Sequence, residues 1–228
     1  MFRWVLALFG ALAIAVLADP RGAHAGGTPP TVHVTTETEA AAKGLALATF
    51  AGGCFWCVEA DFRKVDGVVE VVTGFTGGRV ANPSYDDVAW GRTGHVEAVQ
   101  VTFDPKIVGY DYLVEYYWRH VDPTDGGGQF SDRGTAYRPA IFTHSEAQKA
   151  IAERSRSALA ESKRFGGRIA VSIEPAGRFW PAEESHQNFA AKRPWWYRYY
   201  RHGSGRDTRL DAVWGSEARG PRPQRATH

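Results

Sequence analysis

Apolar residues recur with the spacings of strands and helices from about residue 45 onward. Short runs rich in β-branched and aromatic residues predict strands, and apolar positions three and four residues apart predict helices. The predicted strands cover residues 45–50, 68–76, 96–103, 137–143 and 168–173, and the predicted helices cover 55–65, 111–120, 145–164 and 182–191. The two kinds of element alternate irregularly and without a repeat. We therefore expect an α+β fold with helices packed on a mixed or antiparallel sheet, as in a ferredoxin-like α/β plait.

The first 25 residues have the pattern of a secretory signal peptide. One arginine precedes an uncharged apolar run over residues 4–18, and Ala23-His24-Ala25 follows it. The run is short for a membrane span, and Asp19 and Pro20 end it. We predict cleavage after Ala25 and an exported, periplasmic or otherwise extracytoplasmic protein; an uncleaved anchor helix is the alternative.

Neither flank of the predicted domain shows helical or strand periodicity. Residues 26–44 are rich in Thr, Pro and Ala, which predicts a flexible lead-in to a domain over residues 45–202. From Pro194 the chain is rich in arginine and aromatic residues, and we expect a long coil there. Residues 203–228 are expected to form a coil tail with a disordered end.

Composition narrows the classes of function. The chain of 228 residues is 43% hydrophobic with a formal net charge of +2, so it can bury a core but does not favour nucleic acid. The interleaved aromatics and arginines of residues 194–201 could suit single-stranded nucleic acid, but an exported, nearly neutral chain argues against that. Met1 is the only methionine, and a mature chain without methionine suits work among oxidants.

Both cysteines of the chain lie in one short segment, Ala-Gly-Gly-Cys-Phe-Trp-Cys over residues 51–57. A structural disulfide between Cys54 and Cys57 would close a very small loop and add little stability, whereas a Cys-x-x-Cys pair suits redox cycling. Gly52 and Gly53 allow a sharp turn from strand to helix. Because a helix N-terminus stabilises negative charge, we expect a lowered pKa for Cys54. Cys54 is then the attacking thiolate and Cys57 the resolving thiol.

The residues around this motif suggest a small apolar ligand and a proton donor. Phe55 and Trp56 form an apolar wall beside the nucleophile, although both could simply pack in the core. Strand alternation places Glu97 on the same face as Val99 and Val101. Burial on that face would raise the pKa of Glu97 and make it a general acid; an edge position where Glu97 reaches water is the alternative.

Tyr85, Tyr137 and Asp132 could bind or polarise an oxygen that gains negative charge. Taken singly, each is also a plausible structural loop residue. His186 lies in a predicted short helix without neighbouring residues spaced as metal ligands, so we interpret it as structural and expect no metal site.

Five separated motifs in one order closely resemble the A type of peptide methionine sulfoxide reductases, over about residues 46–200. They are Gly53-Cys54-Phe55-Trp56, Asn82-Pro83-x-Tyr85, Gly94-His95-x-Glu97, Asp132-x-Gly134-x-x-Tyr137-Arg138 and Pro181-Ala182-Glu183-x-x-His186-Gln187. The resemblance implies reduction of the S-epimer of methionine sulfoxide, free or in proteins. It also implies that Cys54 is the nucleophile, that Phe55 and Trp56 hold the substrate's methyl group, and that Glu97 is the acid, assisted by Tyr85, Tyr137 and Asp132.

The expected partners follow from this chemistry. No bound cofactor is needed, since Cys54 becomes a sulfenic acid, Cys57 converts it to a disulfide, and an external dithiol such as a thioredoxin-like protein reduces the disulfide. We expect a monomer that acts on oxidised proteins or peptides. Many family members carry recycling cysteines near the C-terminus, but this chain has no cysteine after Cys57, so either Cys57 or an outside thiol resolves the sulfenic acid; we favour Cys57.

Two other functions remain open from the sequence. A thiol–disulfide oxidoreductase could use the same Cys-x-x-Cys pair, and its activity would not depend on Glu97. A non-catalytic binder of exposed methionine or aromatic peptides would still bind its ligand after replacement of Cys54 by serine.

Overall fold

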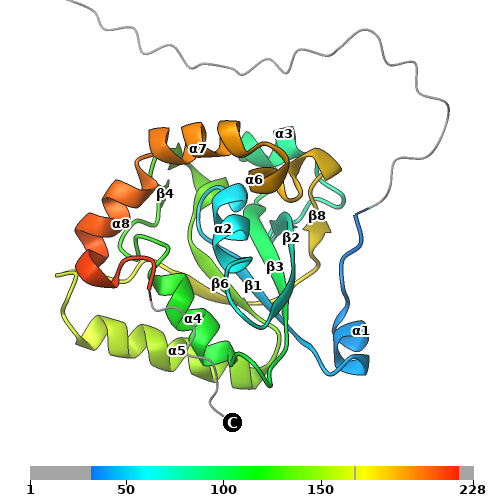
Figure 1. The fold of residues 1–228 in the computed structure, drawn as a ribbon, viewed down its shortest axis with the longest axis horizontal. Coiled ribbons are helices and arrows are strands. Elements are labelled where there is room, and N and C mark those ends of the chain that lie inside the picture. The colour runs from blue at the N-terminus through cyan, green and yellow to red at the C-terminus, as the bar shows by residue number, and fades with distance from the viewer. Residues whose placement is uncertain (1–31, 167, 221–228) are drawn as a thin grey trace, which may run out of the picture. The chain divides into compact units, whose positions relative to one another are not determined.

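A six-stranded sheet in the order β7-β6-β1-β3-β2-β8 forms the centre of the computed structural model, which describes residues 32–166 and 168–220 (Figure 1). Neighbouring strands are antiparallel except β6 and β7, which are parallel. The strands are β1 (Ala46–Ala51), β2 (Val68–Thr76), β3 (Val96–Phe103), β6 (Ala140–Thr143), β7 (Ser172–Pro175) and β8 (Trp180–Pro181). A separate ladder pairs β4 (Gly128–Gln129) with β5 (Asp132–Arg133).

Helices connect and cover these strands. They are α1 (Glu37–Ala42), α2 (Phe55–Phe62), α3 (Tyr85–Ala89), α4 (Tyr110–Trp118), α5 (Glu146–Glu161), α6 (Phe189–Lys192), α7 (Pro194–Gly203) and α8 (Arg206–Trp214), with single 3₁₀ turns at Thr135–Tyr137, Glu184–His186 and Gly215–Glu217. Along the chain these elements follow the order β1-α2-β2-β3-α4-β6, and the four strands lie side by side in the order β6-β1-β3-β2. This is the topology of a ferredoxin-like plait. The predicted α+β fold with helices on a mainly antiparallel sheet is confirmed.

The main core lies between the sheet and helices α2 and α4. Phe50 of β1 stacks on Phe62 of α2 at 4.8 Å between ring centroids and on Tyr117 of α4 at 5.2 Å. The other face of the sheet carries a smaller cluster that includes Ala98 and Phe142 and is covered in part by Phe179. Every residue of β3 is therefore buried, so a polar side chain on this strand is held away from water.

Local sequence signals explain where two of the helices begin. Ser145 precedes α5, and its hydroxyl accepts a hydrogen bond from the backbone N–H of Gln148 at 3.2 Å, which is a favourable N-cap. Thr36 and Glu39 form a full capping box at the start of α1. Helix α1 corrects the prediction of a flexible lead-in over residues 26–44, at least for Glu37–Ala42.

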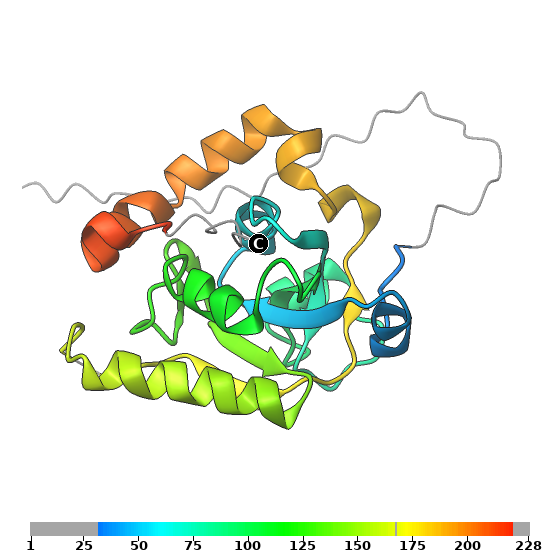
Figure 2. The same ribbon diagram turned by 60° about the horizontal axis from the view of Figure 1, so that its bottom comes forward.

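The predicted C-terminal coil is wrong, because residues 194–214 form α7 and α8. The inner face of α7 consists of Tyr197, Tyr200 and Arg201, and buried Ser204 is the C-cap. These residues have helical spacing but carry polar groups, so an analysis of apolar periodicity does not detect the helix. Leu210 and Trp214 of α8 are fully buried in the main core, so packed structure continues beyond the predicted domain end at residue 202. In Figure 2, the orange-to-red segment α7–α8 arches past α2, away from α5.

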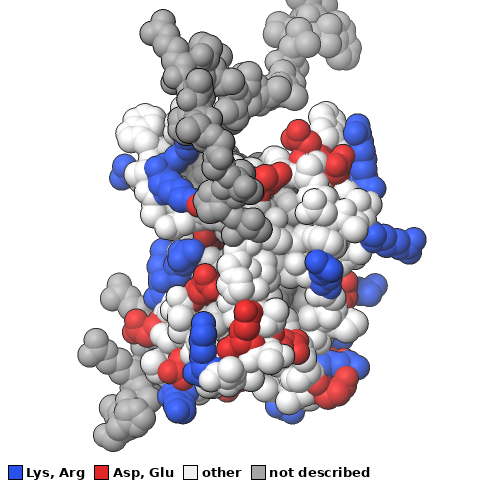
Figure 3. Space-filling view, turned by 90° about the vertical axis from the view of Figure 1, so that its right-hand side faces the viewer, with Lys and Arg blue, Asp and Glu red and all other residues white. Residues whose placement is uncertain are grey.

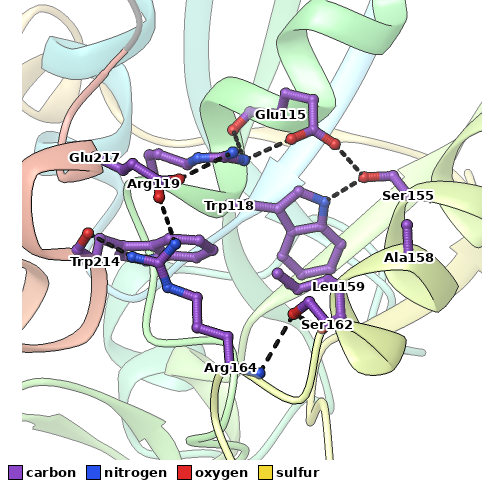
Figure 4. Close-up of a pocket in the computed structure, with 10 residues that line it drawn as sticks. All are labelled: Glu115, Trp118, Arg119, Ser155, Ala158, Leu159, Ser162, Arg164, Trp214 and Glu217. Atoms are coloured by element: carbon purple, nitrogen blue, oxygen red, sulfur yellow. Dashed lines mark hydrogen bonds and ion pairs between the residues drawn. The ribbon is translucent and has the colours of Figure 1, made fainter.

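A cluster of Trp214, Arg119, Arg164 and Glu217 connects the C-terminal segment to the ends of α4 and α5 (Figure 4). The guanidinium groups of Arg119 and Arg164 lie 4.9 Å and 5.0 Å from the centroid of the Trp214 ring. Arg164 also donates to Glu217 at 2.6 Å, and Arg119 lies 3.5 Å from the same carboxylate. A pocket of about 440 Å³ beside this cluster is lined in part by these charged groups. Each of them already has a partner within the cluster. The cluster therefore holds the C-terminal segment in place.

The surface shown in Figure 3 carries positive and negative side chains interspersed, without a continuous field of one sign. None of the described helices combines the length and apolar character needed to cross a bilayer. The predicted signal peptide over residues 1–25, the start of the lead-in and the end of the tail over 221–228 lie outside the described residues.

Candidate active site

A tight turn between β1 and α2 presents the first cysteine. Gly53 has φ +79°, and a Cβ atom there would come within 2.7 Å of the Cβ of Gln129, so only glycine fits without strain. A Cβ at Gly52 would meet the side chain of Val121 at 2.9 Å. The turn places Cys54 at the N-cap of α2, as the sequence predicts.

Glu97 reaches this helix N-terminus from β3. Its Oε2 accepts a hydrogen bond from the backbone N–H of Phe55 at 2.9 Å, and its side chain is buried. Burial raises the pKa of Glu97 to about 8. The hydrogen bond from the Phe55 N–H lowers this pKa, and the nearby charge of Asp132 raises it. The prediction of a buried carboxyl with a raised pKa is confirmed, and the alternative, a Glu97 that reaches water, is wrong. Glu97 is protonated at neutral pH and can donate a proton.

Tyr85 and Tyr137 lie on the same side of the sheet as Glu97, and their hydroxyls share a hydrogen bond. Burial and then the charge of Glu97 raise the pKa of both phenols. Both hydroxyls therefore stay neutral. In the resting site Tyr85 donates to Tyr137, which leaves the Tyr137 hydroxyl proton available to an oxygen atom in the site.

Asp132 is bound from two directions. Its carboxylate accepts a hydrogen bond from the hydroxyl of Tyr200 on α7 at 2.6 Å and another from the backbone N–H of Cys54. Burial raises the pKa of Asp132, although both hydrogen bonds oppose that rise. Asp132 thus links the start of α2 to α7, and Tyr200 joins the site from a segment that the sequence analysis assigned to coil.

An aromatic wall stands beside Cys54, as predicted from Phe55 and Trp56. The Phe55 ring is fully buried and lies 6.1 Å from the ring of Tyr85 and 5.5 Å from that of His186. Trp56 donates its indole N–H to Nδ1 of His186 at 3.2 Å and stacks on Phe189 at 3.9 Å. His186 thus contacts both rings and orients the indole of Trp56.

The two thiols are reduced and buried, with 5% of Cys54 and 1% of Cys57 exposed. Burial, the hydrogen bond with Cys57 and the charges of Glu97 and Asp132 raise the pKa of Cys54. The prediction that the helix N-terminus lowers the pKa of Cys54 is therefore wrong for the resting site. The main physical reason is the burial of the thiol. In addition, carboxyl groups occupy the first N–H groups of the helix: Asp132 accepts from Cys54 N–H and Glu97 from Phe55 N–H.

The pKa of Cys57, in contrast, is lowered. The hydrogen bond that it receives from Cys54 lowers its pKa, burial opposes this, and the positive charges of Arg206 and Arg201 lower the pKa further. Neither arginine was recognised from the sequence, because both lie about 150 residues from the motif in the segment assigned to coil. Across residues 32–166 and 168–220, no cluster of His, Cys, Asp and Glu side chains is arranged to hold a metal ion.

Comparison with known proteins agrees with the motifs and with this geometry. The family model described as peptide methionine sulfoxide reductase matches residues 46–218. The chain is 52% identical over 169 residues to the peptide methionine sulfoxide reductase MsrA of Bacillus licheniformis, covering 74% of this chain and 93% of that protein. It is 51% identical over 172 residues to the MsrA of Listeria monocytogenes, covering 75% of this chain and 97% of that protein.

Solved structures show the same relationship. Reduced Mxr1 from Saccharomyces cerevisiae superposes with a TM-score of 0.62 at 34% identity, covering 67% of this chain and 88% of that one. Methionine sulfoxide reductase A of Corynebacterium diphtheriae gives a TM-score of 0.59 at 36% identity, covering 66% of this chain and 76% of that one. The chain belongs to the peptide methionine sulfoxide reductase family, which confirms the resemblance seen in the sequence.

Proposed function

We propose that this chain reduces methionine S-sulfoxide, free or in proteins, to methionine, with thiols as the source of electrons. The observation that carries the proposal is the protonated, buried carboxyl of Glu97, held at the N-terminus of α2 next to Cys54. A thiol beside a proton donor and an apolar wall suits a substrate with a sulfoxide oxygen and a methyl group. Family membership supports the same reaction.

The first step is the attack of the Cys54 sulfur on the sulfoxide sulfur. The sulfoxide oxygen gains negative charge and takes the proton of Glu97, while the hydroxyls of Tyr85 and Tyr137 donate hydrogen bonds to it. Glu97 recovers a proton from the Cys54 thiol. The S–O bond of the sulfoxide then breaks and the oxygen passes to the Cys54 sulfur. In balance, a thiol and a sulfoxide become a sulfenic acid on Cys54 and methionine, free or within the protein.

The second step regenerates the enzyme. Cys57 attacks the sulfenic sulfur, a Cys54–Cys57 disulfide forms, and water leaves. Two cysteines are all that the chain contains, so the electrons for the next cycle come from an external dithiol, which we propose to be a thioredoxin-like protein.

The finer assignments rest on the same site. The wall of Phe55 and Trp56 takes the methyl group, which leaves the sulfoxide oxygen directed at Glu97 and accounts for a preference for one epimer. The pattern of residues 1–25 and a mature chain without methionine favour repair of oxidised proteins outside the cytoplasm, in the periplasm.

Thiol-dependent reduction of a racemic methionine sulfoxide peptide tests the proposal. We expect no methionine from Cys54→Ser and a rate about 10²–10⁴-fold lower from Glu97→Gln, the usual contribution of a general acid. Glu153→Gln, an exposed position on α5, is the matched control and keeps the wild-type rate. A thiol–disulfide oxidoreductase would instead reduce insulin equally well in the wild type and Glu97→Gln. Full sulfoxide reduction by Glu97→Gln would contradict the proposed mechanism.

A further inference from the structure

Arg206, the first residue of α8, buries a positive charge that no carboxylate neutralises directly. Its side chain is 1% exposed. The guanidinium donates to the carbonyl oxygens of His120 at 3.0 Å and Gly52 at 2.7 Å, and lies 4.4 Å from the ring centroid of Phe130. Within the part of the chain that the structure describes, it takes part in no ion pair. A buried charge of this kind is costly unless an opposite charge lies close by.

The guanidinium lies directly against the turn that leads into the Cys-x-x-Cys helix. Besides its bond to Gly52, its Nη2 is so close to Gly53 that a Cβ on that glycine would be 3.1 Å away. The next residue is Cys54, and Cys57 lies one helical turn further along. Arg206 therefore places its charge beneath the N-terminal turn that carries both thiols.

The carboxylates near Arg206 already have other partners. Asp61 accepts two hydrogen bonds from Arg201, each of 2.9 Å. Asp207 is paired with Arg201 as well, at 2.8 Å, and Asp122 accepts from Arg209 at 2.7 Å. Asp132 binds Tyr200 and the start of α2. Asp132 has no cation of its own, and the nearby charge of Arg206 acts on it as well. The two thiols are the other acidic groups here that no cation pairs with directly.

The groups that act on the Cys57 sulfur come from four elements. They are Cys54 and Asp61 on α2, Glu97 on β3, Tyr197, Tyr200 and Arg201 on α7, and Arg206 on α8. The two tyrosines and Glu97 are neutral near pH 7, because burial raises the pKa of each. Arg201 is largely neutralised by its ion pairs with Asp61 and Asp207, so Arg206 supplies the positive charge near Cys57 that no ion pair holds.

We propose that Arg206 is the fixed counter-charge of the Cys57 thiolate and thereby makes Cys57 the attacking thiol of the resolving step. The inference rests on the proposed function. The Cys57 thiolate attacks the sulfur of the Cys54 sulfenic acid, an S–S bond forms, and the S–O bond breaks. The hydroxide that leaves takes up a proton as water. Cys57 is oxidised as the sulfenic sulfur is reduced, so the step needs no further oxidant. Arg206 touches none of the reacting atoms and is a positioning residue.

Single-turnover experiments over a range of pH test this role. Wild type, Arg206→Met, Arg206→Lys and Arg209→Gln each receive one equivalent of methionine sulfoxide peptide, and methionine, dimedone-reactive sulfenic acid and disulfide are measured over time. Arg209→Gln is the matched control, because it removes a charge from the same helix at a site paired with Asp122. Counting methionine separates the two claims: no methionine from the wild type means that the proposed function fails.

We expect the pH midpoint of disulfide formation to rise by at least one unit in Arg206→Met. Below the midpoint, disulfide formation is then about tenfold slower than in the wild type. Arg206→Lys retains the charge and most of the wild-type profile, and Arg209→Gln matches the wild type. A purely structural Arg206 would slow the step at every pH without moving the midpoint. An unchanged midpoint in Arg206→Met, with methionine still formed, would overturn the inference.

A second measurement does not depend on the folding of Arg206 variants. Thiolate absorbance near 240 nm in Cys54→Ser reports the ionisation of Cys57 alone. We expect Cys57 to titrate below the pKa of about 8.5 of a free cysteine. Titration at or above that value would contradict the role of Arg206.

Discussion

Glu97 is a proton donor because of its surroundings. A carboxyl in water is ionised at neutral pH, but the closed environment on β3 raises the pKa of Glu97 to about 8. Below that pH the group holds the proton that the sulfoxide oxygen needs, and above it the proton is lost. Cys54 is also protonated at rest, since burial raises its pKa. The reactive form of the site thus carries both protons, and its population falls as the pH rises through the pKa of Glu97.

The turn between β1 and α2 determines where the nucleophile stands. It combines a positive φ at Gly53 with close packing against Gln129. Gln129 is in turn fixed by hydrogen bonds with both the N–H and the carbonyl of Asp122. Any side chain at position 53 must therefore displace a buried group that has several partners.

Gly53→Ala is expected to lower the free energy of unfolding by about 1–3 kcal/mol, the range for a strained left-handed residue, and to slow the first turnover. Urea unfolding measures the change. Gly203→Ala is the control, since a Cβ at this helical glycine meets nothing within 4 Å; it should leave stability unchanged or raise it by up to about 1 kcal/mol. Equal stability of the two variants would show that the turn tolerates a side chain.

The sequence predicted the elements whose buried faces are apolar. Strand β3 and helix α2 follow the hydrophobic spacing closely, and with the motifs they were enough to bring Cys54, Glu97 and the aromatic wall together. Helix α7 was missed because its inner face consists of two tyrosines and an arginine. The pKa of Cys54 was predicted in the wrong direction, because the sequence reveals neither how deeply the thiol is buried nor which groups accept hydrogen bonds from the N–H groups at the start of α2.

For the molecule as a whole, the C-terminal segment completes the active site and the core. Helix α7 supplies Tyr200, and α8 supplies Arg206 to the site and Leu210 and Trp214 to the core. The Arg119–Trp214–Arg164 cluster in Figure 4 fixes the end of this segment to α4 and α5. Loosening α8 therefore affects both stability and the environment of the thiols.

Leu210→Ala is expected to lower the free energy of unfolding by about 2–5 kcal/mol, as for other fully buried leucines. Thr208→Ala, an exposed position on the same helix, should change it by no more than about 0.5 kcal/mol. Urea unfolding monitored by tryptophan fluorescence compares the two. A Leu210→Ala variant as stable as the wild type would mean that α8 is not part of the folded core.

The central claim is that a protonated Glu97 beside Cys54 drives the reduction of the sulfoxide. The most direct test is the rate of methionine formation in a single turnover, measured from pH 6 to pH 10 in the wild type and in Glu97→Gln. The account predicts a wild-type rate that falls as the pH rises through about 8, and a slow rate in Glu97→Gln that shows no such fall. A wild-type rate that stays constant or increases through that range would contradict it.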